Sequence, residues 1–569
     1  MISTRLAILT SAFALVFPGA AENQIQIELS PASSPVPEPI MVPELQVVTP
    51  EATLVGQGLN LTPRTGPHDW TRVAPSSDPF LLEVDVQEDF FDHAILTVWN
   101  WHNREVSQHR IAAGVPTTCQ VNISGFGSWL ITLDGFHNGI CQKRFIRNIA
   151  VTEDLNDVRA EWKTNEFFVG VCAFPGRYHW NPGGIPNLPA GLTEVGGRNL
   201  EAELMARLGL QVVRPDESLD MGRRSDGSYI FDFKRMDAAV DAYTSRGFEI
   251  ILQTMNASDW AVIPKYADRG RDRWMFPHEE KPQRAYVEAL VKQYSPVSRF
   301  VQISNEPDQI GYWAGTNEEF VHQFKFTREQ IRETAPNLPI SYGGFSLVDE
   351  AKCQYFLNEL HDFVDLPTYN AHGDLGSYKR SFDTMKRLQA IAGDDAKRWV
   401  NTETGYSAWR LDQERRQGQI DPQKILYTWA HNHAGILLFC SRMTAGPGRE
   451  GTHHFGLLDY QFCPRFVYGT VAALMSTLAG ASFDETIVES DFVHLYSFRK
   501  GKDLILAGFT LEENGVANVV TDADAIVAVD EMGNRQSLAQ NKRIPLSLDG
   551  YPRYWILRNA TFVRPDGSD

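Results

Sequence analysis

From about residue 165 to residue 482, short apolar runs alternate with longer segments in which apolar residues recur with helical spacing. Eight of these runs are predicted strands: Phe167–Phe174, Gln211–Arg214, Glu249–Gln253, Phe300–Ser304, Pro339–Tyr342, Thr368–Ala371, Arg398–Asn401 and Gly435–Cys440. Predicted helices lie between most of them, including Leu200–Leu208, Phe233–Arg246, Pro282–Gln293 and Asn317–Thr334. Connections of this length allow successive strands to pair in parallel. The pattern predicts an α/β fold, a (β/α)8 TIM barrel over 165–482.

An open, doubly wound parallel sheet is the competing interpretation of the same alternation. Such a sheet binds nucleotides through a glycine-rich turn directly after its first strand. Here that turn, residues 174–180, reads FPGRYHW and contains one glycine. The barrel is therefore favoured.

The segments on either side of the predicted barrel have the composition of β domains. Residues 46–164 and 483–569 contain short runs of β-forming residues separated by turn residues. We expect an N-terminal β-sandwich domain over 46–164 and a C-terminal domain of similar type over 483–569. Residues 22–45 include the run PASSPVPEPIMVP (31–43), and proline at this density predicts an extended linker.

The first residues have the pattern of an export signal. Arg5 precedes the apolar run Leu6–Phe17, which is too short to span a bilayer, and small residues follow at Gly19-Ala20-Ala21. We expect residues 1–21 to be a signal peptide, and the protein to be secreted or periplasmic. A short membrane anchor is the alternative, and no later stretch of the sequence is long and apolar enough to predict an integral membrane span.

Charge and composition limit the classes of partner and cofactor. A formal net charge of −18 argues against nucleic acids and anionic lipids, which attract clustered Lys and Arg, but it is compatible with a neutral sugar. No metal or other cofactor is predicted, because His431 and His433 are wrongly spaced for one helix face. The absence of a G-x-S-x-G motif argues against a serine hydrolase. The oligomeric state stays open.

Six cysteines are compatible with disulfides in an exported protein. Cys119 and Cys141 flank two strand-like runs and are the expected pair, and Cys440 with Cys463 is a weaker expectation. Cys172 and Cys440 lie in apolar runs and also fit buried thiols.

Two carboxylates follow predicted barrel strands at the edge where barrel enzymes carry their active sites. The fourth strand ends in Asn305-Glu306-Pro307, and the seventh leads into Glu403, with Gly405 close behind. Each motif alone also fits an ordinary strand-to-helix turn. Together they place two carboxyls on opposite walls of the ring, as hydrolysis of a glycosidic bond requires. Direct attack by one of them needs a separation of about 5–5.5 Å.

These motifs resemble the signature of clan A glycoside hydrolases, and among them the family of β-xylosidases and α-L-iduronidases. The resemblance implies that Glu306 is the general acid/base and Glu403 the nucleophile of a retaining glycosidase. It further implies that Asn305 contacts a sugar hydroxyl, that Arg214 keeps Glu403 ionised, and that His372 lies in the site. Structural roles for Arg214 and His372 fit equally well.

The sequence departs from the clan pattern at two places. Gly373 and Asp374 stand where many members have a tyrosine after the sixth strand, and the eighth strand ends without the usual tryptophan. Sugar-binding tryptophans are expected in the strand-end loops, although each also fits a structural role: Trp180, Trp260, Trp313 and Trp409.

Secreted retaining hydrolysis of a poly- or oligosaccharide is thus the predicted function. A transglycosylase that uses the same two Glu residues and a non-catalytic carbohydrate-binding barrel are the alternatives. The sugar, the linkage, exo or endo action and the role of the N-terminal β domain stay open.

Overall fold

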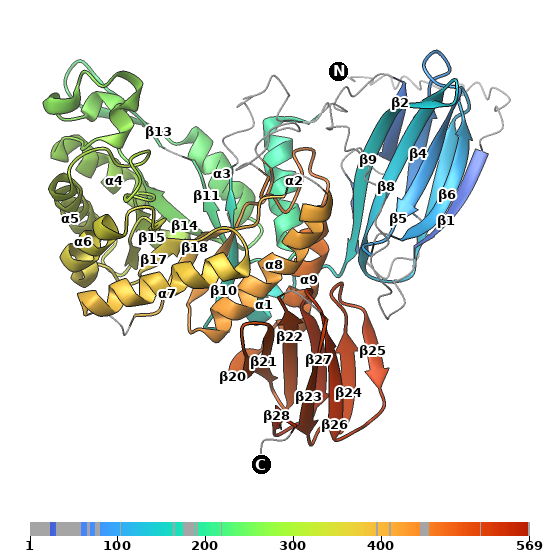
Figure 1. Ribbon diagram of the computed structural model, residues 1–569. Helices are drawn as coiled ribbons and strands as arrows, with labels where there is room; N and C mark the ends of the chain where they lie inside the picture. Colours follow the sequence, from blue (N-terminus) through green and yellow to red (C-terminus); the bar gives the residue numbers. More distant parts are fainter. Residues whose placement is uncertain are drawn as a thin grey trace, which may run out of the picture.

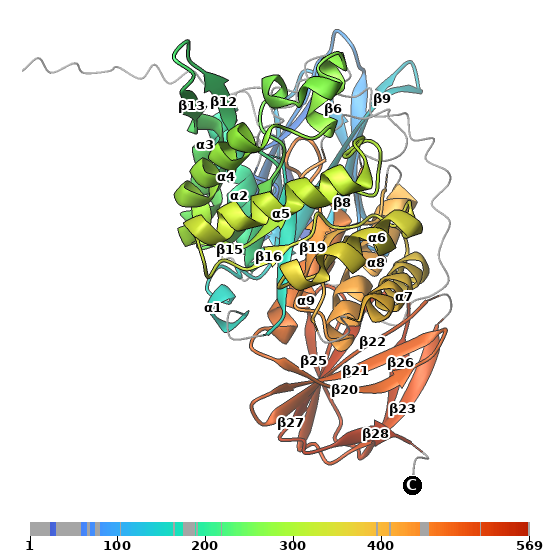
Figure 2. The same ribbon diagram turned by 90° about the vertical axis from the view of Figure 1, so that its left-hand side faces the viewer.

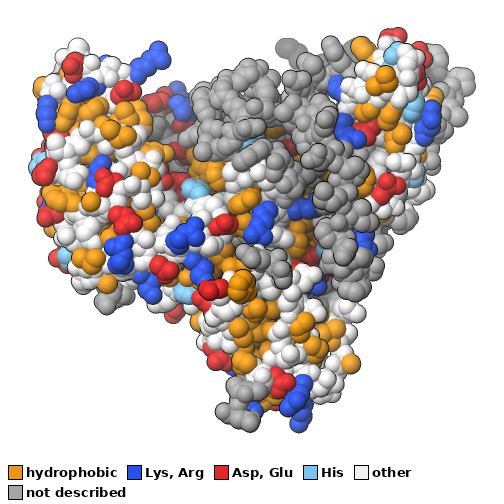
Figure 3. Space-filling model, viewed as in Figure 1, with side chains coloured by type: hydrophobic (Ala, Val, Ile, Leu, Met, Phe, Trp, Pro, Cys, Tyr) orange, Lys and Arg blue, Asp and Glu red, His pale blue; other side chains and the backbone are white. Residues whose placement is uncertain are grey.

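The computed structural model describes residues 23–29, 58–64, 69–73, 80–102, 104–162, 166–174, 188, 192–217, 219–393, 397–408, 411–443, 454–511 and 514–566. A helix-covered barrel, an N-terminal β-sandwich and a C-terminal β domain are arranged around the helices α8 and α9 (Figure 1). The same view in space-filling form has acidic and basic side chains interspersed over the described face (Figure 3).

The barrel contains eight parallel strands, each at one of the eight predicted positions. Their bounds are β10 (Phe168–Ala173), β11 (Val212–Pro215), β14 (Glu249–Thr254), β15 (Ser298–Ile303), β16 (Ile340–Ser341), β17 (Thr368–Asn370), β18 (Val400–Thr404) and β19 (Gly435–Phe439). They pair in the order β16-β15-β14-β11-β10-β19-β18-β17. Parallel bridges Ser341–Leu366 and Phe345–Tyr369 join the two outer strands and close the ring. The prediction of a (β/α)8 barrel is confirmed.

Helices follow the strands and form the outer layer (Figure 2). The barrel helices are α2 (Glu194–Arg207), α3 (Lys234–Thr244), α4 (Glu280–Tyr294), α5 (Asn317–Thr334), α6 (Glu350–Leu360), α7 (Leu375–Ala392), α8 (Leu411–Ala430) and α9 (Phe466–Leu478). Shorter elements are α1 (Arg159–Trp162), the hairpin β12 (Asp220–Arg223) and β13 (Tyr229–Asp232), and the 3-10 turns η3 (Asp259–Ala261), η4 (Pro264–Tyr266), η5 (Gly270–Met275), η6 (Ser295–Val297) and η7 (His361–Phe363).

Side chains of alternating strand positions divide the barrel core into two layers. Cys172, Val212 and Ile251 belong to a small cluster that is separate from the one containing Val213 and Ile250. Successive residues of a strand point to opposite faces, so the first group fills the barrel and the second packs under the helices. A filled barrel leaves the C-terminal strand ends as the place for a site.

The N-terminal domain is a sandwich of two sheets with the orders β1-β7-β4-β2 and β3-β9-β8-β5-β6. Its strands are β1 (Asn23–Leu29), β2 (Leu59–Pro63), β3 (Thr71–Val73), β4 (Phe80–Val86), β5 (His93–Trp99), β6 (Glu105–Ala112), β7 (Thr117–Ile123), β8 (Gly127–His137) and β9 (Ile140–Thr152). Leu82 of one sheet and Leu96 of the other share one buried core.

Two expectations for this region need correction. The predicted linker over 22–45 does not begin as one, because residues 23–29 form a strand that pairs along the whole of β7. Cys119 and Cys141 are free thiols, since Cys119 lies on β7 and Cys141 on β9 of the other sheet. Cys440 and Cys463 are both buried, and the expected disulfide between them is not formed. The predicted signal peptide lies outside the described residues.

The C-terminal domain consists of two facing sheets with the orders β20-β21-β22-β27-β24-β25 and β26-β23-β28. Its strands are β20 (Ser482–Glu489), β21 (Val493–Lys500), β22 (Asp503–Thr510), β23 (Gly515–Thr521), β24 (Ala525–Val529), β25 (Arg535–Leu538), β26 (Arg543–Leu548), β27 (Arg553–Arg558) and β28 (Val563–Pro565). Among the helices that the structure describes, none is long and apolar enough to cross a membrane.

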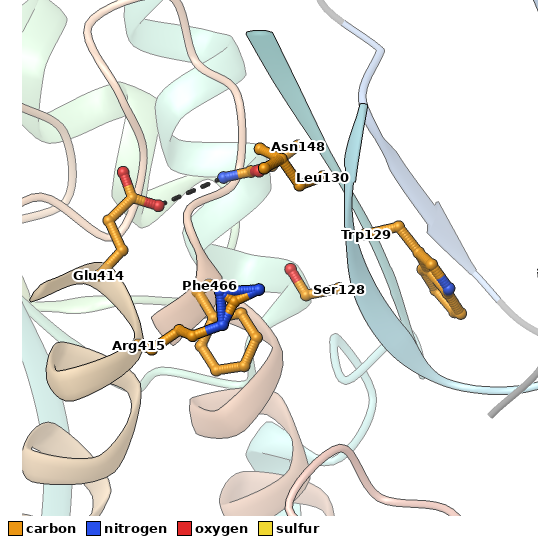
Figure 4. A pocket seen from close by; sticks show the side chains of 7 residues that line it. All are labelled: Ser128, Trp129, Leu130, Asn148, Glu414, Arg415 and Phe466. Carbon is orange, nitrogen blue, oxygen red and sulfur yellow. Dashed lines mark hydrogen bonds between the residues drawn. The ribbon is translucent and has the colours of Figure 1, made fainter. Parts of the chain in front are cut away.

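The N-terminal sandwich contacts both other parts of the chain. Trp101 donates through Nε1 to Glu531 of the C-terminal domain at 3.0 Å, and Arg415 of α8 donates to the Trp101 carbonyl at 3.0 Å. Figure 4 shows a cavity at this contact, where Asn148 donates to Glu414 at 3.4 Å. Its volume of about 10 Å³ has room for about one water molecule. The contact is thus closely packed.

Candidate active site

Glu306 and Glu403 are both held against Asn370 at the C-terminal end of the barrel. Glu306 follows β15 and Glu403 lies within the last residues of β18. Asn370, which ends β17, pairs with Glu403 in the strand register and donates through Nδ2 to Glu306 Oε1 at 2.8 Å. Each Glu is 7% exposed. The barrel thus brings both predicted carboxyls into one largely buried site.

Glu403 is held as a carboxylate by two neighbouring cationic or polar groups. Arg214, at the end of β11, donates through Nη2 to Glu403 Oε1. His372 Nε2 lies 3.6 Å from Oε2. Burial raises the pKa of Glu403, but the Arg214 charge and the contact with His372 outweigh it and bring that pKa to about 2. At neutral pH Glu403 is an ionised group with an available nucleophilic oxygen.

Glu306 has the opposite electrostatic state. Burial and the negative charge of Glu403 raise the pKa of Glu306 to about 8, and the hydrogen bond from Asn370 opposes that rise. Gln309 donates through Nε2 to Glu306 Oε2 at 2.5 Å, so each carboxyl oxygen has an amide neighbour. At neutral pH Glu306 is therefore protonated, whereas Glu403 is charged.

The turn that carries Glu306 has an unusual backbone. Ser304 has φ +72° and Glu306 has φ +39°, a region that residues with a side chain rarely adopt. Glu306 N donates to the Gly343 carbonyl at 2.7 Å. A Cβ on Gly343 would lie 3.0 Å from Asn305 N and from Pro307 Cδ, so a side chain there would crowd this turn.

Gly344 has no side chain, and this leaves space for the side chain of Asn370. It has φ +68°, and a Cβ there would lie 2.6 Å from Asn370 Oδ1 and from Thr402 Oγ1. Thr402 Oγ1 donates to Asn370 Oδ1 at 2.8 Å, which orients the amide so that Nδ2 faces Glu306. The glycine pair after β16 therefore allows the contacts that set the Glu306 environment.

Asn305 has one side of its amide occupied by protein. Its Oδ1 accepts from Gln253 Nε2 at 3.3 Å and from Gln302 Nε2 at 3.4 Å. Gln302 in turn accepts from Arg214 Nη1 at 3.5 Å. With Oδ1 engaged, Nδ2 is the part of the Asn305 amide that can donate to a ligand hydroxyl.

His372 lies in an aromatic corner of the site. Its ring is 5.3 Å from that of Phe439 and 5.1 Å from that of Phe455. Phe439 ends the eighth barrel strand and is partly exposed. It is the aromatic residue at the end of the eighth strand, where the sequence has no tryptophan.

The four predicted sugar-binding tryptophans have different outcomes. Trp313 is 2% exposed, packs against Phe320 and donates to the Thr316 carbonyl at 3.0 Å. It belongs to the core and presents no face to a sugar, so that prediction is wrong. Trp260 is half-buried, is stacked 5.9 Å from Tyr229 and donates to the Met221 carbonyl at 3.1 Å. Trp180 and Trp409 lie outside the described residues.

Several residues of the site were not predicted. Their positions on the strand ends and following turns were the available signal, but an amide, hydroxyl or aromatic residue there is common: Gln309, Asn370, Thr402 and Phe439. The Gly343-Gly344 pair is the one stronger local signal, because adjacent glycines after a strand indicate close backbone approach.

A metal centre finds no support within the described ranges, where no group of three or more His, Cys, Asp and Glu residues could hold an ion. The chemical capacity of the site lies in its two carboxyls. One can attack an electron-poor carbon, and the other can deliver a proton next to it.

No protein-family model matches this sequence, and no curated protein matches it by sequence. The fold does match solved structures. A family 39 glycoside hydrolase from the gut symbiont Bacteroides cellulosilyticus WH2 matches with a TM-score of 0.61 and 14% identity, over 88% of this chain and 100% of that chain. A family 39 β-xylosidase from Caulobacter crescentus has a TM-score of 0.48 and 14% identity, over 69% of this chain and 96% of that one. A family 30 endoxylanase from Clostridium papyrosolvens C71 has a TM-score of 0.46 and 13% identity, over 70% and 96%.

The first of these matches extends over most of both chains. This protein therefore has the fold of a family 39 glycoside hydrolase, with the barrel and its flanking β domains. The predicted resemblance to that family within clan A is confirmed at the level of the fold.

Proposed function

We propose that this protein is a retaining glycoside hydrolase in which Glu403 is the nucleophile and Glu306 the general acid/base. The observation that carries the proposal is the geometry of one buried site, where Arg214 and His372 contact Glu403 while amide groups contact Glu306. In these surroundings the two carboxyl pKa values shift in opposite directions, down for Glu403 and up for Glu306. Double displacement at an anomeric carbon needs one ionised and one protonated carboxyl at the same pH. The family 39 fold agrees with this assignment.

In the first step, a Glu403 oxygen attacks the anomeric carbon while the bond to the leaving oxygen breaks. Glu306 transfers its proton to that oxygen, so the leaving group departs as a neutral alcohol. Arg214 keeps Glu403 charged until attack. The Asn305 amide is placed to donate to a hydroxyl of the bound sugar. The product of this step is a glycosyl ester on Glu403.

Esterification removes the charge of Glu403. The pKa of Glu306 is raised in part by that charge, so it falls once the ester has formed. Glu306, now ionised, takes a proton from water as the water oxygen attacks the anomeric carbon and the ester bond breaks. Two inversions leave the configuration of the sugar unchanged.

Carbohydrate is the proposed substrate, as an oligo- or polysaccharide cleaved at an O-glycosidic bond. A glycan panel with linkage analysis identifies the bond, and product NMR identifies the anomer released. An inverted anomer would contradict the mechanism. Transfer products in place of free sugar indicate a transglycosylase, and binding without turnover across the panel indicates a non-catalytic barrel.

The deciding experiment compares Glu403→Gln with Glu306→Gln. Glu403→Gln should lower kcat by at least about 10⁴-fold on every substrate, since no nucleophile remains. Glu306→Gln should lose activity on oligosaccharides but still accept an activated aryl glycoside, which needs no acid. Its slow second step should then leave a glycosyl adduct on the Glu403 peptide, detectable by mass spectrometry.

Glu489→Gln is the matched control for these variants. Glu489 also has a pKa lowered to about 2, but its partner is His431 and it lies on β20 of the C-terminal domain. Its loss should leave turnover unchanged. Normal hydrolysis by folded Glu403→Gln protein would show that Glu403 is not the nucleophile.

We further propose that residues 1–21 are a signal peptide and that the protein is secreted or periplasmic. The apolar run Leu6–Phe17 and the small residues after it support this proposal. Expression in a secreting host followed by mass analysis should find a mature chain that begins near Glu22. A full-length chain retained in the cytoplasm would contradict it.

A further inference from the structure

Two aromatic side chains next to the Glu306 turn leave part of their surface open. Trp274 lies in η5, in the connection from β14 to α4, and is 38% exposed. Tyr312 lies between β15 and α5 and is half-buried. Their ring centroids are 6.2 Å apart with an interplanar angle of 81°. Trp313, which follows Tyr312 in the chain, is by contrast buried in the core.

The position of Tyr312 relative to Glu306 is set by one short turn. Gln309 N donates to the Glu306 carbonyl at 2.9 Å, and Tyr312 N donates to the Gln309 carbonyl at 3.1 Å. The Gln309 side chain closes the turn on the Glu306 carboxyl. Burial and the charges of Glu306 and Glu403 raise the pKa of Tyr312 to about 12, so its phenol lies in the field of both carboxyls and keeps its proton.

Trp274 is also fixed despite its exposure. Asn256 at the end of β14 donates to the Trp274 carbonyl at 2.7 Å. The neighbouring Met275 carbonyl accepts from Ala314 N at 2.8 Å, which fastens the Trp274 loop to the Tyr312 turn. These bonds restrain the backbone that carries the indole, and such preorganisation lowers the entropic cost of binding.

The chemistry of Glu306 decides which part of a substrate meets this pair. The general acid protonates the oxygen of the leaving group, so groups beside its own turn face the leaving group. The opposite side of the site, next to Glu403, holds His372 with Phe439 and Phe455. The aromatic residues next to Glu306 therefore face the leaving group, and those next to Glu403 face the sugar that is transferred.

We infer that Trp274 and Tyr312 form a leaving-group subsite, which binds a second sugar ring through the open face of Trp274 and the phenol of Tyr312. The inference rests on the proposed function. It makes a saccharide a better leaving group than a small group without a ring, such as a simple alcohol or fluoride. Aromatic faces pack against the C–H faces of sugar rings, and the phenol O–H is a hydrogen-bond donor to a ring hydroxyl.

The test compares two substrates that transfer the same sugar to Glu403. One is the oligosaccharide that the glycan panel shows to be cleaved, and the other is the glycosyl fluoride of the transferred sugar, whose leaving group has no ring to bind. Trp274→Ala should lower kcat/KM for the oligosaccharide by about tenfold and leave kcat/KM for the glycosyl fluoride unchanged. Trp274→Phe should recover most of the loss. Tyr312→Phe should give a smaller loss, again confined to the oligosaccharide.

Phe492→Ala is the control, because Phe492 is an aromatic residue that is 60% exposed beside β21 of the C-terminal domain. Unchanged or equally reduced activity of Trp274→Ala on both substrates would overturn the subsite while leaving the proposed function intact. If wild-type protein cleaves no glycoside, the proposed function and the subsite both fail. Melting curves establish that each variant is folded.

Discussion

Asn370 donates its side-chain amide to Glu306 at 2.8 Å, and its backbone lies opposite Glu403 in the register of β17 and β18. A single residue therefore contacts the Glu306 carboxyl through its side chain and lies beside the strand position of Glu403 through its backbone. Thr402 orients this amide, and Gly344 provides the space for it. The predictions below follow from this arrangement and from its electrostatic consequences.

The pH dependence of kcat/KM should be a broad bell. Activity needs Glu403 ionised, with a pKa of about 2, and Glu306 protonated, with a pKa of about 8. The rate should therefore be flat through weakly acidic and neutral pH and fall tenfold for each unit above about 8. Glu306→Gln, assayed with an activated aryl glycoside, should lack the fall at high pH. If kcat/KM of this variant still falls at high pH, a group other than Glu306 causes the fall.

Asn370→Ala should move the high-pH limb of kcat/KM upward. The hydrogen bond from Asn370 stabilises the charged form of Glu306, so its removal raises the pKa of Glu306 further. The rate maximum should also fall by about 10²-fold, because the acid is less well positioned. Asn358→Ala is a matched control, since Asn358 is an exposed residue of α6. A downward shift of the limb would contradict this account.

Arg214→Met should move the low-pH limb upward and lower kcat. Without the guanidinium, burial dominates and the pKa of Glu403 rises, so less of the nucleophile is ionised at a given pH. Loss of a buried partner also leaves Glu403 incompletely paired. We expect a fall of about 10²–10⁴-fold in kcat/KM at neutral pH, measured against pH from 3 to 9. Arg214→Lys should restore part of the charge effect but not the geometry.

Glu306→Gln should make the folded protein more stable at pH 8 than wild type, but not at pH 4. The folded-state pKa of Glu306 is raised, so the native state holds a proton that the unfolded chain releases as pH rises above its ordinary pKa of 4.5. Wild-type stability therefore falls between about pH 4.5 and about pH 8, and a neutral glutamine avoids this loss. Melting temperatures of both proteins at the two pH values test it, with an expected gain of a few degrees at pH 8.

Glu531→Ala should destabilise the packing of the N-terminal domain. Glu531 is 2% exposed and accepts from Trp101 at 3.0 Å, and its alanine variant leaves that indole and His102 unpaired. We expect a loss of about 2–4 kcal/mol. The pKa of Glu531 is lowered to about 2, so its stabilising contribution is present at neutral pH and is lost as pH falls from about 4.5 towards 2.

The control for this prediction is Glu83→Ala. Glu83 pairs with Arg64 at 2.9 Å, but its side chain is 54% exposed. Exposed ion pairs contribute about 0–1 kcal/mol because solvent screens them. Calorimetry of both variants over pH 3 to 8 separates the two cases, and equal small losses would show that the Glu531 contact does not hold the domains together.

The eight barrel strands and the two strand-end carboxyls were predictable from sequence, because the evidence for them is local. A strand has a period of two residues and a helix a period of 3.6, so each element is visible within its own residues. Asn305-Glu306-Pro307 and Glu403 stand next to such strands in the chain. Residues 317–334 illustrate this, since the predicted helix and α5 have the same bounds.

The predictions that failed depended on contacts between distant residues. Trp313, a predicted sugar-binding residue, packs under α5 and is buried. Trp274 also lies in a connection after a barrel strand, but it is partly exposed next to Tyr312. Cys119 and Cys141 are near in sequence but lie in facing sheets. No local pattern distinguishes these outcomes, because they depend on which surfaces meet after the chain has folded.

The sequence by itself determined the alternation of strands and helices, the two flanking β domains and the carboxyls at the ends of the fourth and seventh barrel strands. Only the tertiary structure decided the protonation states. The pKa of Glu306 rises because the site is buried and Glu403 lies close by, and that of Glu403 falls because Arg214 and His372 lie within hydrogen-bonding or ion-pair distance. Electrostatic interactions in a buried site depend on distance and burial, and both are set by the closed ring and not by spacing along the chain.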